Sequence, residues 1–183
     1  MGSFNLRRID SRRALWVSRS KEMPFFSREN AFSQRGGWWV IGQFTLFILI
    51  LTLPAPDLSE VSFSPFLFHL IGGALITTAI LIILTGMKSL GKAMTPFPYP
   101  IGNAPLIQEG LYRFVRHPLY SGVVLAGFGV SLWRRNVLAA GLSVALAVLL
   151  KAKADQEEVW LIQKFPEYEV YRKKTKQFIP FIY

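Results

Sequence analysis

Four apolar runs, separated by polar segments, organise most of the chain. Residues 38–53 and 66–87 contain no acidic or basic side chain apart from one histidine, and about 20 apolar residues let a helix cross a bilayer. Residues 119–133 and 137–150 are shorter runs joined by the polar turn 134–136, so we expect a helical hairpin that is thin, tilted or incompletely crossing. The pattern predicts an all-α fold: a polytopic membrane helical bundle of about four transmembrane or hairpin helices, plus C-terminal cytoplasmic helices.

The first two runs carry further signals. Trp38 and Trp39 fit the aromatic belt at a membrane interface, and Pro54 ends the first helix. We interpret His69 as an interfacial or helix-contacting side chain rather than a ligand. The small residues 72–74 allow a neighbouring helix to approach closely. We therefore expect the second run to pack against another helix.

The segments after the second and fourth runs differ in character. Four prolines in residues 88–108 exclude a regular helix, so we expect a loop that packs against the membrane domain. The tail starts as a helix that continues out of the membrane, with Lys153 and Glu157 one turn apart on one face. Pro166 ends that helix. A second short helix at 167–174 has tyrosines on one side and basic residues on the other, a pattern suited to a membrane surface.

Composition narrows the classes of function. The chain has 183 residues, 51% of them hydrophobic, and no cysteine, which excludes disulfides, thiolate metal ligands and a cysteine nucleophile. Two histidines are too few for a histidine-only metal cage, so we predict no metal. The net charge of +10 comes from basic residues at the ends of apolar runs. That placement indicates membrane orientation and contact with anionic lipid, and it argues against nucleic acid as a partner.

The distribution of charge predicts an arm and an orientation. The first 36 residues hold eight arginines and lysines, three acidic residues and six serines. This composition favours a basic arm that contacts anionic lipid headgroups, although an organelle targeting segment has a similar composition. Residues 37–183 are the expected membrane domain. The loop 55–65 has no base, whereas the arm, residues 88–116 and the tail are basic. The positive-inside rule therefore puts both termini in the cytoplasm, or on the stromal or matrix side of an organelle. Arg134 and Arg135 oppose this orientation, and in so short a turn we expect them to reach the interface.

Polar groups that could support chemistry are concentrated in residues 110–122, GLYRFVRHPLYSG, and in the first turns of the tail. Each residue alone is more typical of interfacial anchoring, and His-Pro is a plausible helix start. The pair Glu157-Glu158 is costly beside an apolar stripe unless it is paired, and Lys153 one turn earlier offers a partner. We therefore expect one polar cluster at the cytoplasmic ends of the hairpin helices, formed by Tyr112, Arg116, His117, Tyr120, Lys153 and Glu157.

These stretches carry a family resemblance. Residues from about 104 to 182 resemble the C-terminal half of the isoprenylcysteine carboxyl methyltransferase and phospholipid N-methyltransferase superfamily, a group of integral membrane methyltransferases. The matching pattern is G-x-Y, R-H-P-x-Y-x-G, a helical hairpin, E-E, an aromatic residue before a turn residue, Y-x-x-Y and a final proline. The chain departs from it at Pro166, where glycine is common. It also has Ala104 and Pro105 where some members have polar residues, so backbone contacts transfer there more safely than side-chain contacts.

The resemblance implies S-adenosyl-L-methionine as methyl donor and a lipid-like or prenylated acceptor that arrives from the bilayer and carries a carboxylate or an amine. Lys153 matches a position where a basic family residue faces the acceptor. Some members have arginine there, and lysine lacks its bidentate geometry. The residues that match the family's cofactor positions are Ala104, Pro105, Leu106 and Ile107 through their backbone, with Tyr112, His117, Pro118, Leu119, Tyr120 and Glu157.

The chemistry of these side chains is compatible with the resemblance. Aromatic faces stabilise a sulfonium, so the tyrosines of the cluster are suitable neighbours. Glu157 can accept from ribose hydroxyls or an ammonium, while Arg116 and His117 can meet a carboxylate. A carboxylate acceptor needs no base, whereas an amine would need one, for which Glu158 or His117 is nearest. The catalytic candidates are Lys153, Glu158 and Arg116.

Two other functions stay open. An NADPH-dependent membrane reductase of the sterol or steroid type shares a similar C-terminal pattern, ending in a proline and aromatic segment like residues 179–183. A small non-catalytic subunit of a membrane complex would keep the scaffold without the activity. No G-x-G-x-x-G motif follows a strand, so a soluble Rossmann-type methyltransferase is not supported.

Overall fold

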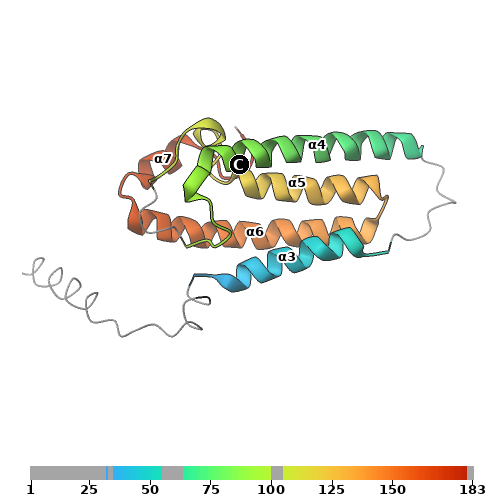
Figure 1. The fold of residues 1–183 in the computed structure, drawn as a ribbon, viewed down its shortest axis with the longest axis horizontal. Coiled ribbons are helices and arrows are strands. Elements are labelled where there is room, and N and C mark those ends of the chain that lie inside the picture. Colours follow the sequence, from blue (N-terminus) through green and yellow to red (C-terminus); the bar gives the residue numbers. More distant parts are fainter. Residues whose placement is uncertain (1–31, 33–34, 55–63, 100–104, 181–183) are drawn as a thin grey trace, which may run out of the picture. The chain divides into compact units, whose positions relative to one another are not determined.

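The described part of the chain is built from helices joined by irregular segments. The computed structural model describes residues 32, 35–54, 64–99 and 105–180, and its compact unit is Arg35–Tyr183. These described residues contain no β-strand, only an isolated parallel bridge between Val115 and Lys176. The all-α class is therefore confirmed for this part of the chain. Its elements (Figure 1) are α3 (Gly37–Thr52), α4 (Pro65–Leu90), α5 (Pro118–Trp133), α6 (Val137–Lys164) and α7 (Tyr168–Lys174), with the 3₁₀ turns η1 (Gly91–Ala93) and η2 (Gly110–Arg113).

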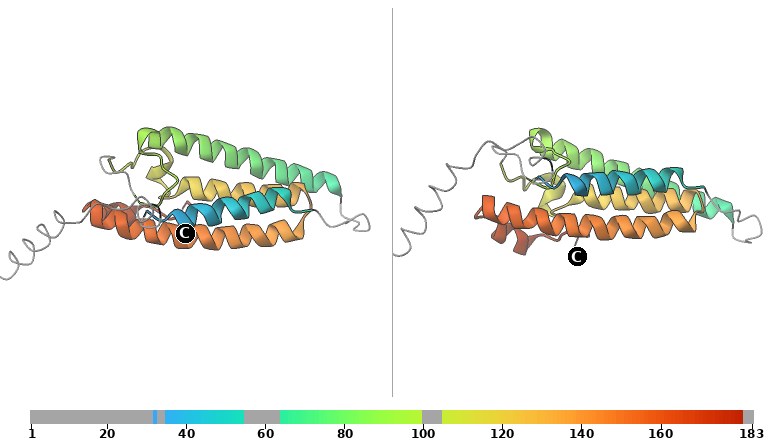
Figure 2. Two further views of the ribbon diagram at one scale, coloured as in Figure 1. Left: turned by 60° about the horizontal axis from the view of Figure 1, so that its bottom comes forward. Right: turned by 90° about the horizontal axis from the view of Figure 1, so that it is seen from below.

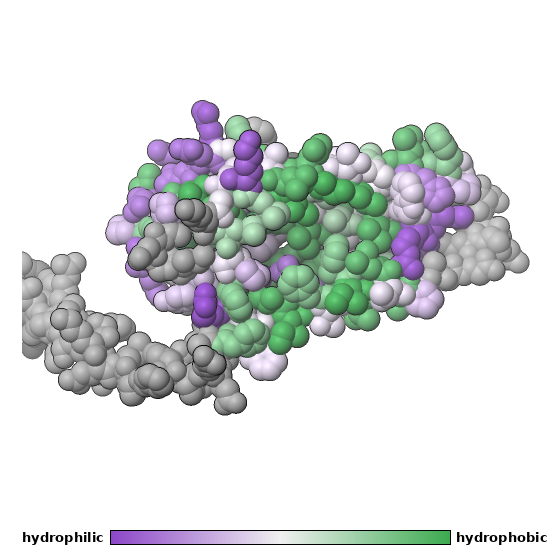
Figure 3. Space-filling model, viewed as in Figure 1, coloured by the Kyte–Doolittle hydropathy of each residue, from purple (hydrophilic) through white to green (hydrophobic). Residues whose placement is uncertain are grey.

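Two of these helices have the length and composition of membrane spans. α4 has 26 residues and α6 has 28, whereas the apolar helices α3 and α5 have 16 each. Only 11% of the most apolar stretch of α4 is buried, which is the reverse of a core helix in a water-soluble protein. Hydrophobic residues cover the middle of the face drawn in Figure 3, and hydrophilic residues gather at its two ends. This is the surface of a membrane-embedded bundle.

Helices α4 and α5 pack closely because glycines lie at their contact. A Cβ added to Gly72 would be 2.7 Å from the Trp133 backbone nitrogen and 2.9 Å from the Gly129 carbonyl oxygen. His69, also on α4, lies beside Trp133 with 5.1 Å between ring centroids. Both observations confirm expectations from the sequence: the small residues admit a neighbouring helix, and His69 contacts that helix.

Replacing Gly72 by alanine should destabilise the bundle, because the new methyl group would meet backbone atoms that cannot yield unless α4 and α5 separate. We expect a loss of about 1–3 kcal/mol, measured as a lower melting temperature of the detergent-solubilised protein. Gly141→Ala is the matched control, since a Cβ there has nothing within 4 Å and alanine favours a helix interior over glycine. Equal melting temperatures for the two variants would contradict the close contact between α4 and α5.

The polar turn between α5 and α6 fastens the end of α3. The Arg134 guanidinium donates to the carbonyl oxygens of Ile50, Leu51 and Leu53 at 3.0, 2.7 and 2.8 Å, groups that a helix C-terminus leaves unsatisfied. Asn136 caps the start of α6 with its side-chain oxygen and donates to the Leu53 carbonyl at 3.2 Å. The sequence predicts only an interfacial arginine here; the carbonyl groups of α3 supply the physical reason for its position.

The chain after α7 returns to the start of α5 and pairs with it. The backbone N–H groups of Arg116 and His117 donate to the carbonyls of Lys176 and Gln177 at 2.8 and 3.1 Å, next to the Val115 bridge. Along the bundle, α4 packs on α5, α5 packs on α6, and α3 contacts both α6 and α5 (Figure 2). As a result η2, the start of α5, the end of α6 and α7 meet at one end of the bundle.

Candidate functional site

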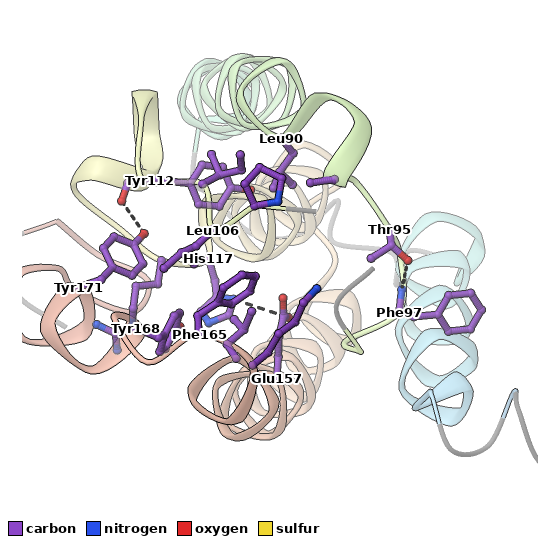
Figure 4. Close-up of a pocket in the computed structure, with 16 residues that line it drawn as sticks. Leu90, Thr95, Phe97, Leu106, Tyr112, His117, Glu157, Phe165, Tyr168 and Tyr171 are labelled. Carbon is purple, nitrogen blue, oxygen red and sulfur yellow. Dashed lines mark hydrogen bonds and ion pairs between the residues drawn. The ribbon is translucent and has the colours of Figure 1, made fainter. Parts of the chain in front are cut away.

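A cavity opens at this end of the bundle, between η2, the start of α5, the end of α6 and α7 (Figure 4). The space between its walls is about 620 Å³, the open solvent at its mouth included. Its walls combine aromatic side chains with a few charged ones. The described residues that line it are Leu90, Ala93, Thr95, Phe97, Pro105, Leu106, Ile107, Tyr112, Arg116, His117, Glu157, Leu161, Lys164, Phe165, Tyr168 and Tyr171.

Glu157 holds the polar centre of this site together. Its Oε2 accepts a hydrogen bond from the Tyr120 hydroxyl at 2.7 Å and lies 3.8 Å from His117 Nδ1. The rings of His117 and Tyr120 are stacked, with centroids 5.2 Å apart and 3° between their planes. Pro118, at the first position of α5, starts the helix directly after His117, so the helix start sets both rings against one carboxylate. The structure brings this predicted cluster together.

Glu158 is the centre of a buried network beside the cavity. Its Oε1 accepts from Arg116 Nε at 2.8 Å and from Gln177 Nε2 at 3.2 Å, and its Oε2 forms an ion pair with Arg172 Nε at 3.1 Å. His117 Nε2 lies 3.3 Å from the same Oε1, so one imidazole bridges two neighbouring glutamates. The Glu158 side chain is 4% exposed and does not line the cavity. Because both oxygens are occupied, the geometry favours a positioning role for Glu158 over the role of a base.

Arg116 also fastens the returning tail. Its Nη1 donates to the carbonyl oxygens of Arg172 at 3.1 Å and Thr175 at 2.5 Å. The same guanidinium therefore joins Glu158 of α6 to α7 and the segment that follows it. Arg116 lies in the wall of the cavity, so the tail and the cavity share one support.

Two tyrosines of α7 complete the cavity, and neither is among the site residues that the sequence predicts. The Tyr171 hydroxyl donates to the Tyr112 carbonyl oxygen at 2.6 Å, whereas the Tyr168 hydroxyl is buried without a hydrogen-bond partner among the described residues. The amphipathic pattern of residues 167–174 favours a helix on the membrane surface, but Tyr168 and Tyr171 pack inwards, 1% and 6% exposed. The Y-x-x-Y spacing, which puts both rings on one helical face, was the available signal.

Burial strengthens the preference of these phenols for the neutral form. It raises the pKa of Tyr112 and of Tyr168 far above the usual value of a phenol, and that of Tyr171 to about 12. The nearby charge of Glu157 adds to the rise in pKa at Tyr112. A neutral phenol keeps its proton to donate at physiological pH. The Tyr168 hydroxyl is therefore a donor available to a molecule bound in the cavity.

Lys153 lies beside the Tyr120 ring and contacts α3. It is 1% exposed, and its ammonium donates to Gln43 Oε1 at 2.8 Å and to the Pro96 carbonyl at 2.9 Å. Its Nζ is 4.9 Å from the centroid of the Tyr120 ring, whose hydroxyl is bonded to Glu157. Tyr120 thus connects the two polar groups. Gln43 was missed by sequence reasoning, although it is the only amide side chain in the first apolar run.

The other predicted site residues fall in separate places. Residues 105–107 line the cavity, whereas Ala104 lies outside the described residues. Leu119 packs on α4, where a Cβ added to Gly86 would be 2.9 Å from its Cδ2. In the described parts of the chain no group of three histidine, aspartate or glutamate side chains could hold a metal ion. The prediction that the protein binds no metal stays a prediction.

Comparison with known proteins bears on the family. Residues 67–168, more than half of the chain, match the family described as phospholipid methyltransferase. The protein-S-isoprenylcysteine O-methyltransferase of Schizosaccharomyces pombe is 34% identical over 79 residues, and the nickel-cobalt-cadmium resistance protein NccN of Alcaligenes xylosoxydans is 34% identical over 80. These matches cover 42% and 43% of this chain and 34% and 37% of the relatives. The chain thus spans little more than a third of the length of the curated relatives it matches.

A solved structure shares the fold. The eukaryotic intramembrane Ras methyltransferase ICMT (isoprenylcysteine carboxyl methyltransferase) matches with a TM-score of 0.59 and 20% identity, over 86% of this chain and 55% of that chain. At this identity the likeness concerns the fold alone. The family match, the relatives and the fold agree with the motifs of residues 110–122 and the E-E pair. The chain therefore belongs to the phospholipid methyltransferase family.

Proposed function

We propose that the protein is an integral membrane methyltransferase that uses S-adenosyl-L-methionine and acts on a lipid-like or prenylated acceptor. The observation that carries this proposal is the cavity in which Glu157, His117 and the unpartnered Tyr168 line one space. A relative named as an isoprenylcysteine O-methyltransferase supports the reaction class. The same relative is the reason for naming a prenylated acceptor.

The residues of the cavity fit S-adenosyl-L-methionine. Glu157 is an acceptor for hydroxyl groups or an ammonium, and the buried Tyr168 hydroxyl is a donor that lacks a partner. The rings of Tyr112 and Phe165 offer faces to a cation or to a flat base, and Arg116 can meet a carboxylate. When bound, this cofactor supplies an activated methyl group on a positively charged sulfur.

The chain's own residues hold and orient the two reactants and exclude water from them. These are the main contributions of a protein to a displacement at carbon. His117 lies between Glu157 and Glu158, and these contacts hold its ring in the cavity wall. Tyr120 joins Glu157 to the Lys153 side through its hydroxyl and its ring face. The α7 tyrosines close the remaining wall.

The surroundings of Lys153 favour an acceptor with a negative charge. Its ammonium is buried, its hydrogen-bond partners Gln43 and Pro96 are neutral, and no described carboxylate lies within ion-pair distance of it. A buried ammonium is costly unless an anion compensates it. An acceptor carboxylate would supply that anion and would need no base. For an amine acceptor His117 would be the better placed base, because it lines the cavity and Glu158 does not.

Thermal unfolding of the detergent-solubilised protein tests the cofactor. We expect S-adenosylhomocysteine at 100 times its Kd to stabilise the folded protein by about 2.7 kcal/mol and thereby to raise the melting temperature. NADPH should leave the melting temperature unchanged. Stabilisation by NADPH with none by S-adenosylhomocysteine would overturn the proposal in favour of a reductase. Stabilisation by neither would favour a non-catalytic subunit.

The acceptor is tested with an isotopically labelled methyl donor. Membranes containing the protein are incubated with a farnesylated cysteine that has a free carboxylate, and separately with phosphatidylethanolamine. We expect base-labile methyl ester on the prenylated compound. Label that stays on the amine lipid after alkaline treatment would refute the carboxylate assignment while leaving the methyltransferase proposal intact.

We also propose that both termini lie on the cytoplasmic side and that residues 1–36, most of which lie outside the described residues, contact anionic headgroups. The support is the basic character of the arm and of the segments at the cavity end of the bundle. The chain has no cysteine, so Ser64→Cys and Glu169→Cys each create a single labelling site. Ser64 directly precedes α4, at the end of that helix away from the cavity, whereas Glu169 lies in α7 at the cavity end. An impermeant maleimide added outside cells should label Ser64→Cys only, and the reverse pattern would contradict this orientation.

A further inference from the structure

A cationic cleft lies on the same end of the bundle as the cavity, between α6 and the segment that follows α7. It holds about 840 Å³, its open side included. Among the described residues, its lining has one carboxylate, Asp155, and the polar side chains of Thr175 and Gln177. The remaining lining residues are all basic: Arg116, Lys151, Arg172, Lys173, Lys174 and Lys176.

The positive charge of the cleft is not balanced from within. Asp155 accepts from Lys151 at 2.7 and 2.6 Å and from Gln177 at 2.9 Å, so its carboxylate is already in use. Three further lysines, Lys173, Lys174 and Lys176, are exposed, and no described acidic side chain lies within ion-pair distance of them. Like charges gathered in one concave surface raise its potential and attract an anion. The chemistry of the cleft therefore calls for a ligand with more than one negative oxygen.

The position of the cleft, next to the end of the apolar stretch of α6, indicates that the membrane is the source of that ligand. Lys151 is the first charged residue of α6 after the uncharged stretch 137–150, which extends about 21 Å at 1.5 Å per residue. The cleft therefore begins where the apolar surface ends, at the level of the lipid headgroups. Val170 and Ile179, which flank its lysines in the chain, are 56% and 51% exposed. Exposed apolar side chains next to lysines are typical of a surface in contact with a bilayer.

We propose that this cleft binds the phosphate of an anionic phospholipid headgroup from the adjacent leaflet. Lysine ammonium groups attract the phosphate as point charges, and the Arg172 guanidinium, 54% exposed, can donate to its oxygens while Nε stays on Glu158. Helix α7 thus contributes Tyr168 and Tyr171 to the cavity wall and its basic residues Arg172, Lys173 and Lys174 to the lipid site. A bound headgroup would fix α7 against the bundle.

The test uses the full-length protein in neutral detergent and three probes: short-chain phosphatidylglycerol, short-chain phosphatidylcholine and inorganic phosphate. Isothermal titration should give saturable binding of phosphatidylglycerol, weaker with rising salt, and no measurable binding of phosphatidylcholine. The double variant Lys173→Gln/Lys174→Gln should bind phosphatidylglycerol about 30-fold more weakly, the factor that two lysines near an anionic surface contribute.

The control Lys88→Gln/Arg113→Gln removes the same charge from exposed positions outside the cleft and should keep the parent affinity. If the control loses as much affinity as the double variant, the loss reflects the net charge of the protein rather than the cleft, and the proposal is overturned. Equal binding of phosphatidylcholine would overturn it too, and inorganic phosphate that binds as tightly as the lipid would assign the site to a soluble anion instead. If the double variant does not fold, Lys176→Gln gives the same comparison, with about a 5-fold expected loss. None of these measurements requires a methyl donor, so they succeed or fail independently of the proposed function.

Discussion

Replacing Glu157 by alanine should weaken the binding of S-adenosylhomocysteine at least about 100-fold while the folded protein persists. Glu157 is the acidic residue that lines the cavity, and a hydrogen bond to a charged group contributes about 1.5–3 kcal/mol. A carboxylate that accepts from two ligand groups would therefore account for a loss of this size. The change also removes the acceptor of the Tyr120 hydroxyl at 2.7 Å, but the packing of the four long helices does not depend on that bond. Isothermal titration in detergent measures the affinity, and circular dichroism checks the fold.

The matched control is Glu169→Ala, which removes an exposed glutamate of α7 and should leave affinity and melting temperature at the parent values. Glu157→Gln separates charge from shape, because glutamine can still accept from Tyr120 but cannot balance an ammonium. We expect this variant to lose most of the affinity as well. If both Glu157 variants bind S-adenosylhomocysteine as tightly as the parent, the cavity is not the cofactor site.

The helices of the bundle could be predicted from the sequence because apolar runs and helix breakers agree. The four runs match α3, α4, α5 and the first half of α6 within three residues at each end. Pro118 starts α5, and Asn136 caps α6 with its side-chain oxygen, both for local reasons that a sequence displays directly. The continuation of α6 to Lys164 follows from the helical spacing in the tail. Fold class and element bounds are thus local properties of this chain.

The walls of the site depend on contacts that no local pattern encodes. The tail pairs with the start of α5 through Arg116 and Lys176, which are 60 positions apart in the chain, and a single parallel bridge leaves no periodicity to read. The sequence predicts Tyr168 on a membrane surface because an aromatic face is equally compatible with lipid and with protein. Glu158 was a candidate base because its partners Arg172 and Gln177 come from segments whose proximity the sequence does not reveal.

Replacing Arg116 by leucine should cost about 3–5 kcal/mol of stability, the usual penalty for removing one partner of a buried ion pair. Glu158 would lose its 2.8 Å partner while its side chain stays buried, and the tail carbonyls of Arg172 and Thr175 would lose their donor. The melting temperature of the detergent-solubilised protein should fall by about 6–20 °C. Arg113→Leu removes an exposed arginine three residues earlier and should change the melting temperature by less than about 2 °C.

The double variant Arg116→Leu/Glu158→Leu decides which of these losses dominates. If the cost arises from the buried Glu158 charge that has lost its closest cation, removing that charge should restore at least about 1 kcal/mol relative to Arg116→Leu alone, because an apolar pair can replace a buried ion pair with little penalty. Arg172 would lose its acceptor, but its side chain is 54% exposed and can turn to water. A double variant no more stable than the single one would instead mean that the tail carbonyls are the main partners of Arg116. Arg116 would then stabilise the site chiefly by fastening α7, and the Glu158 charge would be secondary.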